Sequence, residues 1–158
     1  MHITAKEETT SRGLTSTARI GSHPLHPMLV SFPIVCFVGA LVTDIAYWQT
    51  AQMMWADFSA WLLAVGLVMG VLAAIAGLID FLGNRQIRKL SEAWVHLAGN
   101  VLVLILALFN SFVHSRDAWT SVVPTGLILS ALTVLTLLVT GWMGWAMVYR
   151  HRVGVTRS

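Results

Sequence analysis

In HPLHPMLVSFP, residues 23–33, two histidines stand directly before a long apolar run. Pro27 has the fixed φ that suits the first position of a helix, and its missing N–H would have no intrahelical partner there. The pattern therefore predicts that a helix begins at Pro27, with His23 and His26 where it enters apolar surroundings. Imidazoles in that position can bind a metal, a haem iron or a proton, or can simply face headgroups and water.

The composition is that of a membrane protein. Hydrophobic residues make up 56% of the 158 residues and charged residues only 11%, and the mean hydropathy is +0.74. A soluble domain carries about 25% charged residues, so most of this surface is not expected to face water. The formal charge of +3 is then a sign of membrane topology and not of nucleic-acid binding.

Four apolar runs are each long enough to cross a bilayer, which takes roughly 20 helical residues. In lipid a backbone must satisfy its own hydrogen bonds, so each run predicts a helix. The connections are short, which favours antiparallel neighbours and predicts an all-α, integral membrane four-helix bundle that runs up-down-up-down. The runs are residues 27–48, 58–82, 93–114 and 122–148.

Basic residues set the expected orientation. Nine of the ten lie before the first run, between the second and third runs, or after the fourth, and Arg116 alone lies on the other side. By the positive-inside rule both termini are expected to be cytoplasmic. The chain then divides into a flexible polar cytoplasmic tail (1–22), a four-helix transmembrane domain (23–149) and a basic cytoplasmic tail (150–158).

Small residues mark one face of the second run. Gly66, Gly70, Ala73 and Gly77 recur every three or four positions, which is the spacing of one helix face. Such a stripe lets another helix approach closely, and it equally leaves room for a flat cofactor. Pro33 lies one to two turns into the first run and is expected to kink that helix.

Ionisable residues within a span cost about 2.5–3.5 kcal/mol each, so they usually face the bundle interior. Asp44 follows His26 by 18 residues, and His114 follows His96 by the same number. Each pair therefore shares one helix face, displaced by about 27 Å along the axis. Two polar levels are predicted: His26 with His96 near the cytoplasmic face, and Asp44 with His114 as an ion pair or proton relay near the outer face.

The cytoplasmic level matches what a six-coordinate b-type haem requires, namely two neutral imidazoles on different helices across a space lined by small residues. We expect His26 and His96 to be the axial ligands, with His23 as the substitute for His26. The anionic propionates would find cations in the adjoining connection, which contains Arg85 and Arg88.

The same level has two other interpretations. A small zinc or non-haem iron site could use His26, His96 and the carboxylate of Asp80, at the end of the second run. Alternatively, the polar side chains form a hydrogen-bonded network that fixes the bundle and binds nothing. No phosphate-binding loop and no hydrolase motif of the Gly-x-Ser-x-Gly or His-Glu-x-x-His type supports hydrolytic or nucleotide-driven chemistry.

The segments HPLHPMLVSFP, ALVTDIAYW, GLIDF and WVHLAGN together resemble DUF2231, a family of uncharacterised bacterial four-helix membrane proteins. The resemblance covers about residues 23–114, and HPLHP is its most specific element. It implies a multi-pass protein of the bacterial inner membrane. Some members look fused to Rieske-type or c-type cytochrome modules, which implies electron transfer, and the layout is distantly similar to four-helix b-type cytochromes.

We therefore expect a membrane electron-transfer subunit that binds one b-type haem and exchanges electrons with quinone or a partner redox protein. The alternative is a non-catalytic accessory or assembly subunit whose polar face packs against a larger membrane complex. Transport is less favoured, because four short helices leave little room for a substrate pathway unless the protein forms an oligomer.

Overall fold

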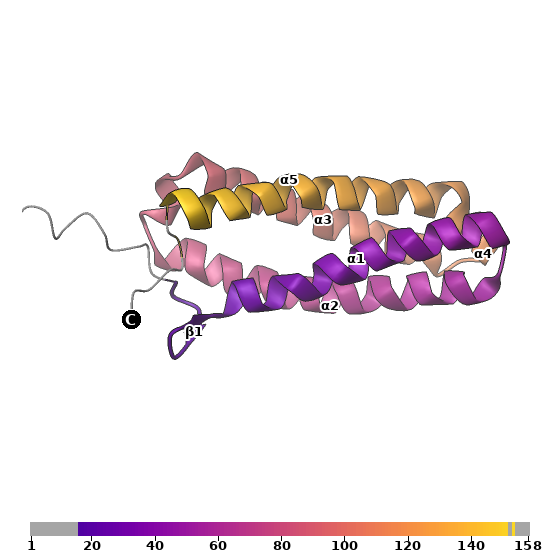
Figure 1. The fold of residues 1–158 in the computed structure, drawn as a ribbon, viewed down its shortest axis with the longest axis horizontal. Helices are drawn as coiled ribbons and strands as arrows, with labels where there is room; N and C mark the ends of the chain where they lie inside the picture. The colour runs from indigo at the N-terminus through magenta and orange to yellow at the C-terminus, as the bar shows by residue number, and fades with distance from the viewer. Residues whose placement is uncertain (1–15, 152, 154–158) are drawn as a thin grey trace, which may run out of the picture.

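Four long helices run side by side in the computed structural model, which describes residues 16–151 and 153, without the side chains of residues 118 and 119 (Figure 1). They are α1 (Leu25–Thr50), α2 (Met53–Gly83), α3 (Ser91–His114) and α5 (Leu127–His151). All four spans are long and apolar enough to cross a membrane, the last one counted from residue 122. The prediction of an all-α four-helix membrane bundle is confirmed.

The helices begin close to the predicted positions. α1 begins two residues before Pro27, with Pro24 as its extended N-cap (φ −69°, ψ 133°). Pro27 thus lies in the first turn, where its missing N–H removes no helical hydrogen bond. α1 continues through Pro33, which is buried. α2 begins at Met53, five residues before the start of the second apolar run.

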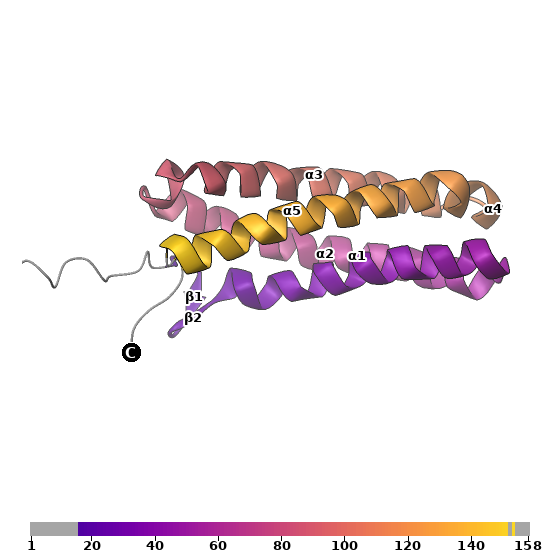
Figure 2. The same ribbon diagram turned by 45° about the horizontal axis from the view of Figure 1, so that its top comes forward.

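Short connections make consecutive helices antiparallel (Figure 2). Two residues join α1 to α2, and Ala51 there has the left-handed conformation (φ 53°). The connection from α2 to α3 contains the 3₁₀ helix η1 (Ile87–Lys89). α3 leads through α4 (Ala118–Ser121) and the π-helix η2 (Val122–Gly126) into α5.

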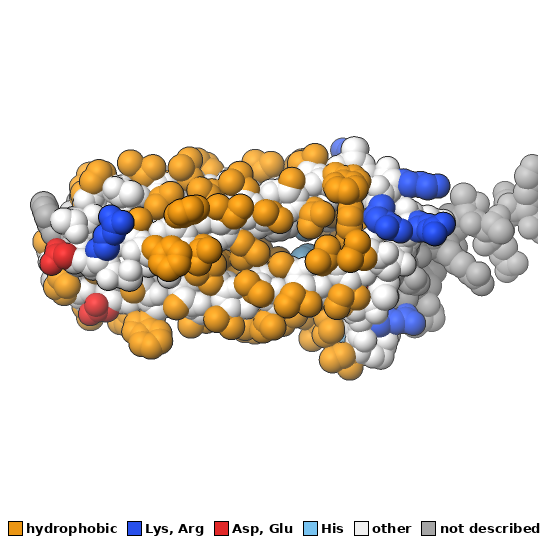
Figure 3. Space-filling view, turned by 180° about the vertical axis from the view of Figure 1, so that it is seen from behind, with side chains coloured by type: hydrophobic (Ala, Val, Ile, Leu, Met, Phe, Trp, Pro, Cys, Tyr) orange, Lys and Arg blue, Asp and Glu red, His pale blue; other side chains and the backbone are white. Residues whose placement is uncertain are grey.

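The described chain begins and ends at the same end of the bundle (Figures 1 and 2). This end carries five of the six described Lys and Arg residues, and we call it the basic end (Figure 3). The sixth, Arg116, lies at the opposite end. Hydrophobic side chains cover the length between the two ends, as a surface in contact with lipid requires. The five are Arg19, Arg85, Arg88, Lys89 and Arg150.

A small hairpin precedes α1. Strand β1 (Arg19–Ile20) pairs antiparallel with β2 (His23–Pro24). The turn between them contains Gly21, whose φ of 61° lies in the left-handed region, where a glycine has little steric strain. Residues 16–22, which the sequence analysis included in the polar tail, thus form part of the described structure. Residues 1–15 lie outside the described residues.

Glycines bring the helices together in two pairs, α1 with α2 and α3 with α5. A Cβ added at Gly66 of α2 would lie 2.6 Å from Cε1 of Phe37 on α1. A Cβ added at Gly99 of α3 would overlap Thr140 on α5. The paired backbones therefore approach each other as closely as small residues allow, as in other membrane helix pairs.

The middle of the bundle is closed by an apolar cluster, in which Phe37 and Leu63 are 1% exposed. It lies between the two polar levels. The remaining members of this cluster are Ala40, Val103 and Ala107.

Gly66→Ala is expected to lower the free energy of unfolding by about 1–3 kcal/mol, because the new methyl group must displace the buried ring of Phe37. Thermal unfolding in detergent, followed by circular dichroism, measures the change. Gly141→Ala is the matched control, since a Cβ there would have no neighbour within 4 Å in the part of the chain that the structure describes. Equal stability of the two variants would contradict the close approach of α1 and α2 at Gly66.

Candidate functional site

His26 and His96 lie next to each other near the basic end. His26 comes from the first turn of α1 and His96 from the second turn of α3. The centres of the two rings are 5.9 Å apart, and the ring planes are nearly perpendicular, at 84°. The two histidines therefore join the α1–α2 pair to the α3–α5 pair.

Each ring binds a backbone carbonyl of the neighbouring helix in its pair: His26 of α1 binds α2, and His96 of α3 binds α5. Nδ1 of His26 donates to the carbonyl oxygen of Ala73 on α2 at 2.8 Å, and Nδ1 of His96 donates to that of Thr140 on α5 at 2.8 Å. A carbonyl can only accept, so Nδ1 carries the proton in both rings. The neutral rings therefore keep their lone pairs at Nε2, which is the tautomer that binds a metal through Nε2.

Each ring also packs on a glycine, which lies four residues after the residue that supplies the carbonyl. A Cβ added at Gly77 of α2 would lie 2.8 Å from Nδ1 of His26, and one at Gly144 of α5 would lie 3.0 Å from Cε1 of His96. The two helix pairs thus repeat one arrangement, with a histidine on the first helix and a carbonyl and a glycine on the second. The sequence already shows one likeness between the pairs, since a polar residue follows each of these histidines after 18 positions on the same helix.

The two rings border a cavity of about 340 Å³ that all four helices line. Most of its wall is apolar or without a side chain, and three members of the predicted small-residue stripe, Gly70, Ala73 and Gly77, contribute to it. The fourth, Gly66, packs on Phe37 instead. Among the described residues, neither Nε2 atom has a hydrogen-bond partner.

Asp80 borders the same cavity, and its carboxylate is bound by the chain segment that precedes α1. Oγ of Ser16 donates to it at 2.8 Å, and the backbone N–H groups of Thr17 and Ala18 each donate at 2.6 Å. These bonds fasten residues 16–18 to the end of α2. Within the described part of the chain, no group of three or more His, Cys, Asp or Glu side chains could hold a metal ion.

The remaining predicted site residues lie at the basic end, outside the residues that line the cavity. His23 is exposed in β2, where its backbone pairs with Ile20. Arg85 is exposed just before η1 and Arg88 is half-buried within it. Another histidine at this end, His151 of α5, was not a predicted site residue and lies beside Glu92, with 3.5 Å between Nε2 and Oε1.

Sequence reasoning missed the contribution of α5. The carbonyl of Thr140 accepts the hydrogen bond of His96, and the ring of His96 packs on Gly144. Neither residue was among the predicted site residues. The sequence did contain one indication of this role. Thr140 and Gly144 are four residues apart and so share one helix face, as Ala73 and Gly77 do on α2.

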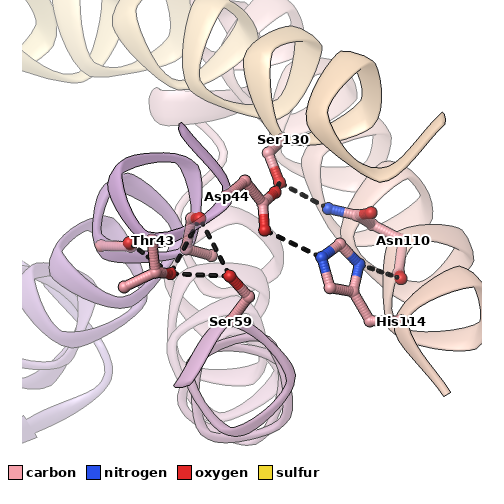
Figure 4. Close-up of polar contacts among 8 residues, drawn as sticks. Thr43, Asp44, Ser59, Asn110, His114 and Ser130 are labelled. Carbon is pink, nitrogen blue, oxygen red and sulfur yellow. Dashed lines mark hydrogen bonds and ion pairs between the residues drawn. The ribbon is translucent and has the colours of Figure 1, made fainter. Parts of the chain in front are cut away.

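At the opposite end, Asp44 and His114 form the predicted pair, with 2.9 Å between Nε2 of His114 and Oδ1 of Asp44 (Figure 4). Their exposed fractions are 0% and 8%. Ser130 donates to Oδ2 of Asp44 at 2.6 Å, and the side-chain amide of Asn110 donates to Ser130 at 2.7 Å. Nδ1 of His114 donates to the carbonyl oxygen of Asn110 at 3.0 Å.

This network leaves one proton to be shared between Asp44 and His114. Nδ1 of His114 carries a proton because its partner is a carbonyl, and the hydroxyl proton of Ser130 points to Asp44. Whether the shared proton sits on nitrogen or on oxygen, the pair is neutral overall, which limits the cost of burying it in a membrane. The network joins α1, α3 and α5 and so holds the helix pairs together at this end.

Asp44→Ala is expected to lower the free energy of unfolding by about 3–5 kcal/mol, because it leaves His114 and Ser130 buried without an acceptor. Ser130→Ala should cost less, about 1–3 kcal/mol, since the aspartate keeps its histidine. Thermal unfolding in detergent gives both values. The double variant Asp44→Leu with His114→Leu should recover stability relative to Asp44→Ala, and failure to do so would contradict this account.

Asp80→Ala is expected to free residues 16–18 from the bundle, because it removes the acceptor of their hydrogen bonds. Limited trypsin digestion should then cleave after Arg19 faster than in the unaltered protein. Asp57→Ala, which removes an exposed carboxylate at the opposite end, is the matched control. Equal cleavage rates in both variants would show that Asp80 does not hold the segment.

Comparison with known proteins gives one match. The family model described as "Predicted membrane protein (DUF2231)" matches residues 22–157, which includes all four long helices. No curated protein and no solved structure matches the chain. Because the match covers most of the chain, the protein belongs to DUF2231, a family of predicted membrane proteins.

Proposed function

We propose that this protein is a membrane electron-transfer subunit that binds one b-type haem between His26 and His96. The observation that carries the proposal is the pair of imidazoles on one cavity, each with Nδ1 bound to a backbone carbonyl and Nε2 without a partner among the described residues. A carbonyl bound to Nδ1 orients a ligating histidine and raises its basicity, as in other metal proteins.

The distance between the rings supports this proposal. Two imidazoles that bound one metal ion through Nε2 from opposite sides would have ring centres about 6 Å apart, since each bond is about 2 Å long and the nitrogen lies about 1 Å from its ring centre. The ring centres of His26 and His96 are 5.9 Å apart. Perpendicular ring planes are compatible with this arrangement, because each ring can turn about its own bond to the metal.

The chemical character of the cavity wall also suits a flat apolar cofactor. Residues without a side chain beyond Cβ line it on α2 and α5, and the remaining wall is mainly aliphatic, so a macrocycle meets few polar groups. The carboxylate of Asp80 is already bound by residues 16–18. Arg85 and Arg88 stand at the same end and supply positive charge of the kind that propionates attract.

A haem held in this way would supply one-electron redox chemistry. His26 and His96 would both be ligands of the iron, so the site would suit electron transfer and not the binding of a small molecule at the metal. The chain itself would orient the ligands through Ala73 and Thr140 and exclude water through the apolar wall.

The proposed setting is the inner membrane of a bacterium, with the basic end in the cytoplasm, because basic residues favour that side. Quinone within the bilayer, or a partner redox protein, would exchange electrons with the haem.

The test is an absorbance spectrum, reduced minus oxidised, of protein purified after expression with ample haem. A Soret band and an α band, at one haem per chain, are expected. Absence of both bands would overturn the proposal and favour the accessory or assembly role, in which changes at His96 alter stability without any chromophore.

Variants sharpen this test. His26→Ala and His96→Ala should each lose the bands of a six-coordinate haem, and added imidazole should restore them, because the free ligand can fill the vacated place. His23→Ala is the matched control and should keep the spectrum, since His23 is exposed outside the cavity. Circular dichroism confirms that each variant is folded. Loss of the bands in His23→Ala alone would contradict the choice of ligands.

A further inference from the structure

A second hollow, of about 540 Å³, lies on the outer surface between α2 and α3. Only apolar side chains line it, among them Leu67 and Val71 from α2 and Leu108 from α3. Val101 and Leu104 of α3 line both this groove and the cavity of the two histidines. The groove therefore adjoins the cavity, and the two form one path from the lipid-facing surface to the interior.

The boundary between groove and cavity is narrow. A Cβ added at Gly70 of α2 would lie 2.9 Å from Cδ2 of Leu104, so a flexible leucine side chain faces a glycine there. In Figure 3, which views the face of α2 and α3, an opening between hydrophobic side chains reveals a histidine. The cavity is thus open towards the lipid between these two helices.

One further polar side chain lines the cavity between the histidines and this boundary. Asn100 lies one turn after His96 and one turn before Leu104, and its Nδ2 donates to the carbonyl oxygen of His96 at 2.8 Å. Its Oδ1 accepts no hydrogen bond from the described residues. A side-chain amide oxygen in an apolar cavity is an acceptor for a ligand that carries a hydroxyl group.

We propose that a lipid-soluble quinol binds along this path, with a head hydroxyl donating to Oδ1 of Asn100 and the prenyl tail in the groove between α2 and α3. A prenyl tail is apolar along its length, as the groove is. An acyl chain of a phospholipid would fill the groove but would bring no hydroxyl donor to Asn100. The quinol head would take part of the cavity that the proposed function assigns to the haem, so the inference goes beyond that function and does not depend on it, and binding of the quinol needs no haem.

The experiment uses the full chain in lipid nanodiscs and a quinol whose prenyl tail carries a photoreactive diazirine. After irradiation, mass spectrometry of peptides locates the label. We expect labelling to concentrate on residues 67–72 and 101–108, to compete with unlabelled quinol, and to resist an equal excess of phospholipid.

Two variants test the contact of the quinol head and that of its prenyl tail separately. Asn100→Leu should weaken competition by quinol about tenfold, because it removes one hydrogen-bond acceptor from an apolar site. Leu104→Trp should abolish labelling by filling the boundary between groove and cavity. Leu135→Trp is the matched control, since Leu135 faces lipid on α5 and is 59% exposed.

Labelling spread over all lipid-facing helices, or displaced equally by phospholipid, would overturn the inference. Unchanged competition in Asn100→Leu would do the same for the head-group contact. A protein that labels as expected but has no Soret band would overturn the proposed function alone. A haem-bearing protein without specific labelling would overturn the quinol site alone.

Discussion

The membrane core holds no water, so a polar group buried there must find its hydrogen-bond partner within the protein. His26 and His96 meet this requirement with backbone carbonyls, and a carbonyl of a neighbouring helix is within reach only where that helix has no side chain in the way. Gly77 and Gly144 supply that access. The same two glycines therefore determine how closely the helices pair and which nitrogen of each imidazole stays free.

The two ends of the bundle use histidine in opposite ways. At one end both nitrogens of His114 are engaged, and the network with Asp44 ties the helix pairs together. At the basic end, His26 and His96 bind partners among the described residues through Nδ1 alone, and a cavity remains between the helix pairs. An apolar cluster around Phe37 separates the two ends. The same four helices are thus joined by a hydrogen-bonded network at one end and border a cavity at the other.

Particular residues show how far the sequence could predict this site. Asp44 and His114 were expected to meet because 18 residues are five helical turns, so that each returns to the face of the histidine near the basic end. The contact of His96 with α5 was not expected, because the helix that packs beside α3 depends on how the two helix pairs cross. The binding of Asp80 by residues 16–18 was also missed, since a short polar segment has no periodicity that indicates where it docks.

The order of residues along the chain is enough to predict a four-helix membrane protein, the residues that share a helix face, and the end that is basic. These properties follow from apolar length, from 3.6 residues per turn and from the distribution of charge, all of which are local along the chain. Three features become visible only in the folded protein: His26 and His96 bind carbonyls through Nδ1, the cavity opens towards lipid between α2 and α3, and Asp80 holds the segment before α1. Those features depend on contacts between residues far apart in the chain, which packing of whole helices brings together.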